Sequence, residues 1–120
     1  MSVKIVKKAE TEPISLPKDS WSKMMLVKDT VGAQKMSLGV SQFNPGLETA
    51  LLTHEAEELA FVMKGKGKLR LADGSEVPYE AGDGIYIPAG VAHSVVVDGD
   101  EPVEMCFGFS WPAYPPTQRA

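Results

Sequence analysis

Short alternating segments separated by turn sequences run through most of this chain, and they constrain its fold more than any other feature. The sharpest turn sequences are Asn44-Pro45-Gly46, Asp73-Gly74 and Pro88-Ala89-Gly90, where glycine permits positive φ and proline fixes φ. Residues 35–43 alternate, and we predict that Met36, Leu38 and Val40 share the inward face. No segment shows convincing helical periodicity. The pattern predicts an all-β sandwich or barrel.

We predict ten strands, over residues 4–6, 23–27, 35–43, 47–54, 58–63, 68–72, 76–79, 84–87, 93–97 and 103–110. A chain of 120 residues is enough for one domain. We therefore expect an N-terminal arm over residues 1–20, a barrel over 21–110 and a C-terminal tail over 111–120. Trp111 and Tyr114 in that proline-rich tail either cap the mouth of the barrel or pack against a partner subunit.

The composition narrows the class of protein. A net charge of −4 argues against nucleic acid or an anionic membrane as partner, since both attract a basic surface. No segment has the length of a membrane span, and the first ten residues lack the apolar stretch of a secretory signal. Cys106 is the only cysteine, so an intramolecular disulfide is impossible. We expect a cytoplasmic protein.

His54, Glu58 and His93 are the candidate metal ligands, and the chain has no other histidine. Leu52 and His54 share one face of a strand because side chains alternate with a period of two. Glu58 begins the next strand after a tight corner, and His93 follows a turn that can carry its strand to the same interior. Two imidazoles and one carboxylate suit iron(II), and also manganese, nickel, cobalt or zinc, with positions left open for substrate.

Two glycine-punctuated motifs contain these ligands. The first runs from Gly46 through Leu52, His54 and Glu58 to Gly65, and the second runs as Gly82, Pro88, Gly90 and His93. Over about residues 35 to 110 the chain resembles the cupin superfamily, whose fold is a jelly-roll barrel, also called a double-stranded β-helix. The resemblance implies that His54, Glu58 and His93 are metal ligands. Two positions depart from the family pattern: Leu52 replaces the first histidine, and Val97 replaces the final asparagine.

The resemblance implies several functions. We predict a metal-dependent enzyme, with one divalent Fe, Mn, Ni or Zn ion, that acts on a small oxygen-rich or carboxylate metabolite as a dioxygenase, decarboxylase or isomerase. A non-catalytic module that binds a sugar or another small molecule beside a degenerate metal site is the alternative. A structural dimer with an inert barrel is a third reading. The catalytic residues are not identified by the sequence.

Two further side chains are candidates for binding substrate. Gln42 either orients substrate in the pocket or is a hydrogen-bonded amide at the end of a strand. Tyr86 either donates a hydrogen bond to a substrate oxygen or packs outward at a subunit interface. Because small cupins commonly pair through their sheets, we expect a homodimer.

Overall fold

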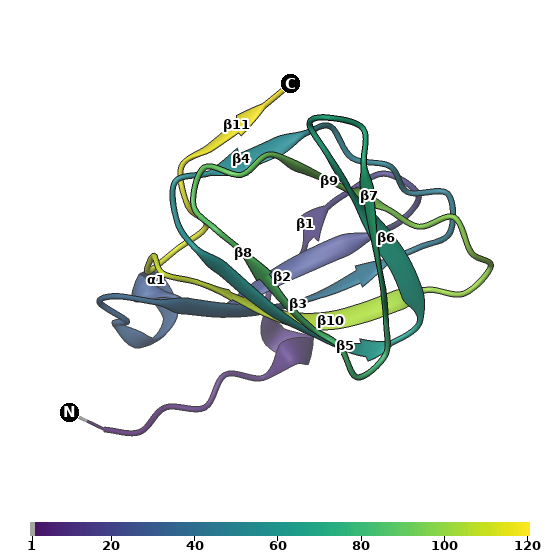
Figure 1. The fold of residues 1–120 in the computed structure, drawn as a ribbon. Coiled ribbons are helices and arrows are strands. Elements are labelled where there is room, and N and C mark those ends of the chain that lie inside the picture. Colours follow the sequence, from purple (N-terminus) through teal and green to yellow (C-terminus); the bar gives the residue numbers. More distant parts are fainter. Residues whose placement is uncertain (1) are drawn as a thin grey trace.

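The computed structural model describes residues 2–120 as two facing antiparallel sheets that enclose a barrel (Figure 1). The six-stranded sheet has the order β1 (Ile14–Ser15), β2 (Trp21–Leu26), β3 (Ser37–Phe43), β10 (Val103–Phe109), β5 (Glu58–Lys64) and β8 (Gly84–Ile87). The five-stranded sheet has the order β11 (Thr117–Arg119), β4 (Leu52–His54), β9 (His93–Val96), β6 (Lys66–Leu71) and β7 (Glu76–Glu80). Two short helices, η1 (Lys8–Glu10) and α1 (Lys28–Val31), lie outside the sheets. This arrangement confirms the predicted all-β jelly-roll barrel.

The ends of the chain differ from the sequence prediction. Residues 4–6 form no strand, and Ile5 is 88% exposed because nothing pairs with it. The first strand is instead β1, where Ile14 pairs with Ser22 of β2. The tail contributes β11, which pairs with β4, so both chain ends add an edge strand to a sheet.

The predicted strand over residues 47–54 is shorter in the structure. The Leu47 N–H donates to the Asn44 carbonyl in a turn, and Glu48 forms an isolated bridge with Val96. Regular pairing begins only at Leu52, which lies opposite His93. The turn at Asn44 thus takes up the first residues of the predicted strand.

Strand β3 presents the opposite face from the one predicted. The buried side chains are those of Ser37, Ser41 and Phe43, whereas Leu38 is 38% exposed and Met36, just before the strand, is 67% exposed. Gly39 shows the reason, since a Cβ there would lie 2.6 Å from the Phe107 ring. The inner face of β3 must stay small so that aromatic rings from β10 can fill the barrel.

The apolar interior divides into two parts. The main core, toward one end of β5 and β10, consists of Phe43, Leu47, Val62, Leu69, Tyr79, Ile87, Val97, Val103 and Met105. A smaller cluster, toward the other end of these strands, consists of Ala56, Phe107 and Phe109. None of the helices in residues 2–120 has the length and hydrophobicity needed to cross a bilayer.

Candidate metal centre

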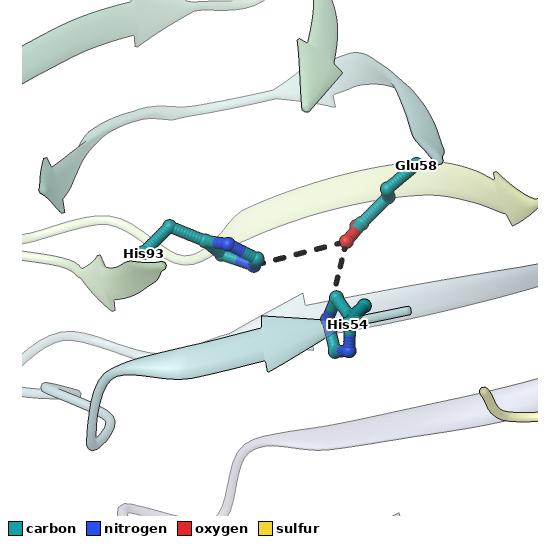
Figure 2. Close-up of side chains that lie close together, drawn as sticks. All are labelled: His54, Glu58 and His93. Atoms are coloured by element: carbon teal, nitrogen blue, oxygen red, sulfur yellow. Dashed lines mark ion pairs between the residues drawn. The ribbon is translucent and has the colours of Figure 1, made fainter. Parts of the chain in front are cut away.

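The structure brings the three predicted ligands together inside the barrel. His54 ends β4, Glu58 begins β5 and His93 begins β9. Each offers one ligand atom, and these atoms lie within 4.8 Å of one another. Figure 2 shows both imidazole rings beside the carboxylate of Glu58. The Nε2 atoms of His54 and His93 lie 3.5 and 3.8 Å from the same oxygen, Glu58 Oε1.

Strand pairing and one turn position these side chains. Leu52 and His93 are partners across β4 and β9, so His54 lies two residues beyond that pair on the same buried face. The turn at Pro88–Gly90 is tied to β4 because the Gly90 N–H donates to the His54 carbonyl. Glu58 is reached by a short connection from His54 in which Ala56 is buried.

Hydrogen bonds fix which nitrogen of each imidazole carries the proton. The Thr117 hydroxyl donates its single proton to the Pro115 carbonyl at 2.8 Å, so it accepts from His54 Nδ1–H at 2.7 Å. His93 Nδ1–H donates to the Val91 carbonyl at 3.0 Å, because a carbonyl only accepts. In both rings Nε2 keeps its lone pair and is the atom nearer Glu58. Such outer partners orient ligands at metal sites.

Burial shifts the ionisation of all three groups. Burial raises the pKa of Glu58 to about 7, and its side chain is 14% exposed. Burial lowers the pKa of His54 to about 4, with smaller contributions from the charges of His93 and Arg119. Burial also lowers the pKa of His93, against an opposing effect of its bond to Val91. Both imidazoles are therefore neutral near pH 7, as metal ligands must be.

The distances within the cluster suit a shared cation better than direct hydrogen bonds. Separations of 3.5 and 3.8 Å are longer than the 2.7–3.2 Å of an ordinary hydrogen bond. Ligand atoms placed about 2.0–2.2 Å from one ion lie roughly 3–3.5 Å from each other. The residues present thus fit a divalent transition metal after small side-chain movements.

A cavity of about 250 Å³ adjoins the cluster. Aromatic edges form one wall, since the Phe109 and Tyr114 rings lie 5.1 and 5.7 Å from the His54 ring. On another side the hydroxyls of Ser22 and Ser41 share a 2.7 Å hydrogen bond. The remaining lining residues are Ile14, Leu16, Phe43, Thr49, Leu52, Glu58, Val95, Met105, Phe107 and Arg119. Leu52 gives an apolar contact where the family pattern has a histidine.

The two predicted substrate-binding residues do not line this cavity. Gln42 follows Ser41 on β3, so its side chain lies on the opposite face, where Nε2 donates to Asn44 Oδ1 at 3.0 Å. Tyr86 is 57% exposed, and its hydroxyl donates to the Glu57 carboxylate. Substrate binding by Gln42 and Tyr86 therefore stays a prediction, and neither side chain lies beside this cavity.

Sequence reasoning missed the contribution of the tail. Capping of the barrel mouth by Tyr114 was one of the two readings of the tail, but Thr117, which contacts His54, and Arg119, which lines the cavity, were not predicted. The detectable signal was the spacing of Thr117 and Arg119, which share one face of any strand that follows Pro116.

Comparisons with known proteins agree with this architecture. Auxin-binding protein 1 from Arabidopsis thaliana is 32% identical over 111 residues, which cover 81% of this chain and 56% of that protein. The chain thus spans little more than half the length of this relative. The polyketide cyclase RemF from Streptomyces resistomycificus has a TM-score of 0.83 at 21% identity, with 99% of this chain and 86% of that one covered.

A Lactobacillus farciminis oxalate decarboxylase, in a formate complex, has a TM-score of 0.79 at 21% identity, with 92% of this chain and 34% of that one covered. At such identities the structural likeness shows the fold alone. The sequence model of the cupin domain matches residues 39–109, more than half of the chain. The chain therefore belongs to the cupin family.

Proposed function

We propose that this cupin binds one divalent transition metal, Fe, Mn, Ni or Zn, through His54, Glu58 and His93, and acts with it on a small oxygen-rich or carboxylate metabolite. One observation carries the proposal: both imidazoles are held with Nδ1 protonated, so both Nε2 lone pairs are available beside one carboxylate. A buried carboxylate and two buried imidazoles cost free energy unless a partner compensates them.

The chain's own residues suit a metal-assisted reaction on a small ligand. A bound cation would polarise a substrate oxygen and stabilise developing negative charge. Leu52 supplies no donor atom, so at least one more coordination position is left to substrate or water. The aromatic wall of Phe109 and Tyr114 restricts water around the ligands. Dioxygenase, decarboxylase and isomerase reactions all fit this arrangement.

Metal analysis after separate incubation with Fe(II), Mn(II), Ni(II) and Zn(II) tests the ligand set. We expect about one equivalent in the natural protein and less than about a tenth in His54→Ala and His93→Ala. Glu57→Gln is the matched control, because this neighbouring carboxylate is exposed and should leave metal content unchanged. Metal that survives both histidine changes, or a natural protein that retains none, would refute the proposal.

A non-catalytic role is the second candidate. Two observations favour it: Leu52 removes one ligand from the family's set, and the relative from Arabidopsis thaliana is named for binding auxin. Dioxygen uptake and carbon dioxide release, screened with the metal-loaded protein and small carboxylates, separate the two roles. Turnover that is lost in Glu58→Gln supports the enzyme, whereas saturable binding without turnover supports the binding module.

We also infer that the protein is a homodimer that pairs through the outer face of its six-stranded sheet. This outer apolar face consists of Met36, Leu38, Leu59, Phe61 and Met63, which are 38–67% exposed. Together with Cys106 and Gly108 most of these residues line a shallow groove over the middle of the sheet. Contiguous apolar surface of this kind marks interaction sites, and a second copy can cover it by two-fold symmetry.

Light scattering after gel filtration tests the dimer. We expect twice the 12.9 kDa chain mass for the natural protein and a shift to monomer in Phe61→Ser. Val77→Ser, at a 47% exposed position on the other sheet, is the control. A monomeric natural protein would rule the dimer out.

A cytoplasmic location is part of the proposal. It rests on the free thiol of Cys106, which has no second cysteine to pair with in this chain. Cell fractionation with an antibody to the protein checks it, and recovery outside the cytoplasmic fraction would contradict it.

A further inference from the structure

Strands from opposite ends of the sequence meet around the cavity of the metal centre. Ile14 and Leu16 come from the N-terminal edge of the six-stranded sheet, and Arg119 comes from β11 at the edge of the five-stranded sheet. The cavity is thus lined by residues from both sheet edges as well as from the barrel interior. These edge residues lie outside the two signature motifs.

Strand pairing directs Arg119 toward the cavity. Thr117 lies opposite His54, and Arg119 lies opposite Leu52. Residues two apart share one face of a strand. Because Thr117 contacts the His54 ring, Arg119 emerges on the same side, and it lines the cavity beside Leu52 and His54.

The Arg119 guanidinium has no ion-pair partner within residues 2–120. The other arginine, Arg70, behaves differently: it is paired with both Glu48 and Glu76. Arg119 is exposed and lines the cavity beside Leu52 and His54. An unpaired guanidinium beside an apolar cavity has its full donor set available for a carboxylate.

The charge balance of the cavity favours an anion. Glu58 and Arg119 are the only lining residues with a formal charge, and they are of opposite sign. Together with a divalent cation on the three ligands, Glu58 and the exposed Arg119 would leave an excess of two positive charges at the cavity. A ligand with one carboxylate reduces this excess from two charges to one, whereas a neutral ligand leaves it at two.

We propose that Arg119 is the residue that binds the carboxylate of the substrate, and that the substrate is a compact carboxylic acid with an apolar body and an oxygen donor at its other end. The carboxylate pairs with the guanidinium, the body lies along Phe107, Phe109 and Tyr114, and the oxygen faces His54, Glu58 and His93. The last contact rests on the proposed metal-dependent function. A cavity of about 250 Å³ has room for about eight water molecules, which matches a ligand of about one ring.

Titration calorimetry with two probes tests this assignment. 4-Hydroxyphenylacetate carries the carboxylate and an oxygen at the far end, and 4-hydroxyphenylacetamide is its neutral analogue. Both are titrated into the protein as purified and into the Zn²⁺-loaded protein. We expect the natural protein to prefer the carboxylate, and Arg119→Gln to weaken carboxylate binding about tenfold or more while changing carboxamide binding less than about twofold.

Two variants keep the outcome specific. Arg119→Lys should restore part of the preference, because lysine supplies the charge without the planar pair of donors. Gln118→Ala changes the neighbouring residue on the opposite face of β11 and should bind both probes like the natural protein. Zinc content should be the same as in the natural protein for Arg119→Gln, Arg119→Lys and Gln118→Ala.

The possible results separate this assignment from the metal proposal. Equal binding of the two probes by the natural protein, or equal loss of both in Arg119→Gln, would overturn the role of Arg119. Failure of the natural protein to retain Fe(II), Mn(II), Ni(II) and Zn(II) alike would overturn the metal site alone, because the carboxylate preference of the protein as purified still reports on Arg119.

Discussion

The two ends of the barrel interior use the same strands for different purposes. At one end β5 and β10 contribute Val62 and Val103, which are 0% exposed within the main core. At the other end the same strands contribute Glu58 and Phe109 beside two buried histidines. Apolar burial stabilises the first end, whereas polar burial at the second costs free energy. The main core thus stabilises the fold against the free-energy cost of burying polar groups at the ligand end.

The largest effect on folding should come from the main core. Val62→Ala removes two methyl groups from a fully buried position and should lower the free energy of unfolding by about 2–3 kcal/mol. Zinc stoichiometry should be unchanged, because Glu58 lies four residues away, at the start of β5. Chemical denaturation and metal analysis measure the two quantities.

The control for this change is Val77→Ala, the same substitution at a position that is 47% exposed. Its effect should stay within about 0.5 kcal/mol. If Val62→Ala also lowered the zinc content strongly, the main core and the ligand end would not be energetically independent.

A smaller effect is expected at the ligand end from Thr117→Val. The change keeps the shape of the side chain but leaves His54 Nδ1–H without its acceptor. Loss of such an outer partner typically weakens metal binding about 10–100-fold. Competition with a chromogenic zinc chelator measures the affinity. Thr53→Val on the neighbouring strand is the matched control, and equal affinities in the two variants would show that Thr117 does not orient His54.

The pH dependence of zinc affinity should also distinguish the ligand end from the main core. Because burial raises the pKa of Glu58 to about 7, its carboxyl group must lose a proton before it binds metal below that pH. The pKa of His54 is about 4, so His54 does not compete for protons over this range. Zinc affinity should rise about tenfold per pH unit from pH 5.5 to 7 and then level off. An affinity that is constant over this range would contradict the assignment of Glu58.

The main core should not share this dependence. The difference in unfolding free energy between the natural protein and Val62→Ala should be equal at pH 5.5 and pH 8. Val62 packs in the apolar main core, so the substitution changes no contact of a group that titrates between these pH values. Denaturation at both pH values checks this. A difference that changed by more than about 0.5 kcal/mol would mean that the two ends are coupled.

The sequence was sufficient for the central strands and for the three ligands. The alternation in the predicted strand over residues 103–110 places Val103, Met105, Phe107 and Phe109 on one face, and the structure buries all four. The spacing of His54, Glu58 and His93 predicted a common interior, and their ligand atoms do converge. These features depend on local periodicity and turns, which a sequence records directly.

The sequence was misleading for strand β3, where most of the apolar side chains face outward. On β3 the residues Leu38 and Val40 appeared to be the core face, but space inside the barrel is taken by Phe107, and small side chains are required there. Strand β11 in the tail was not predicted for a related reason, since it is stabilised by pairing with β4 and not by its own propensity. Both errors come from tertiary packing that no local pattern reports.

Strand β11 has only three residues and pairs with a single neighbour, β4. Short edge strands exchange their amide hydrogens by opening locally, at a much lower free energy than global unfolding. Release of β11 would withdraw Thr117 and Arg119 together while the remaining strands stay paired. The orientation of the His54 imidazole and the presence of Arg119 beside the cavity thus depend on a single local opening equilibrium at the carboxyl-terminal segment.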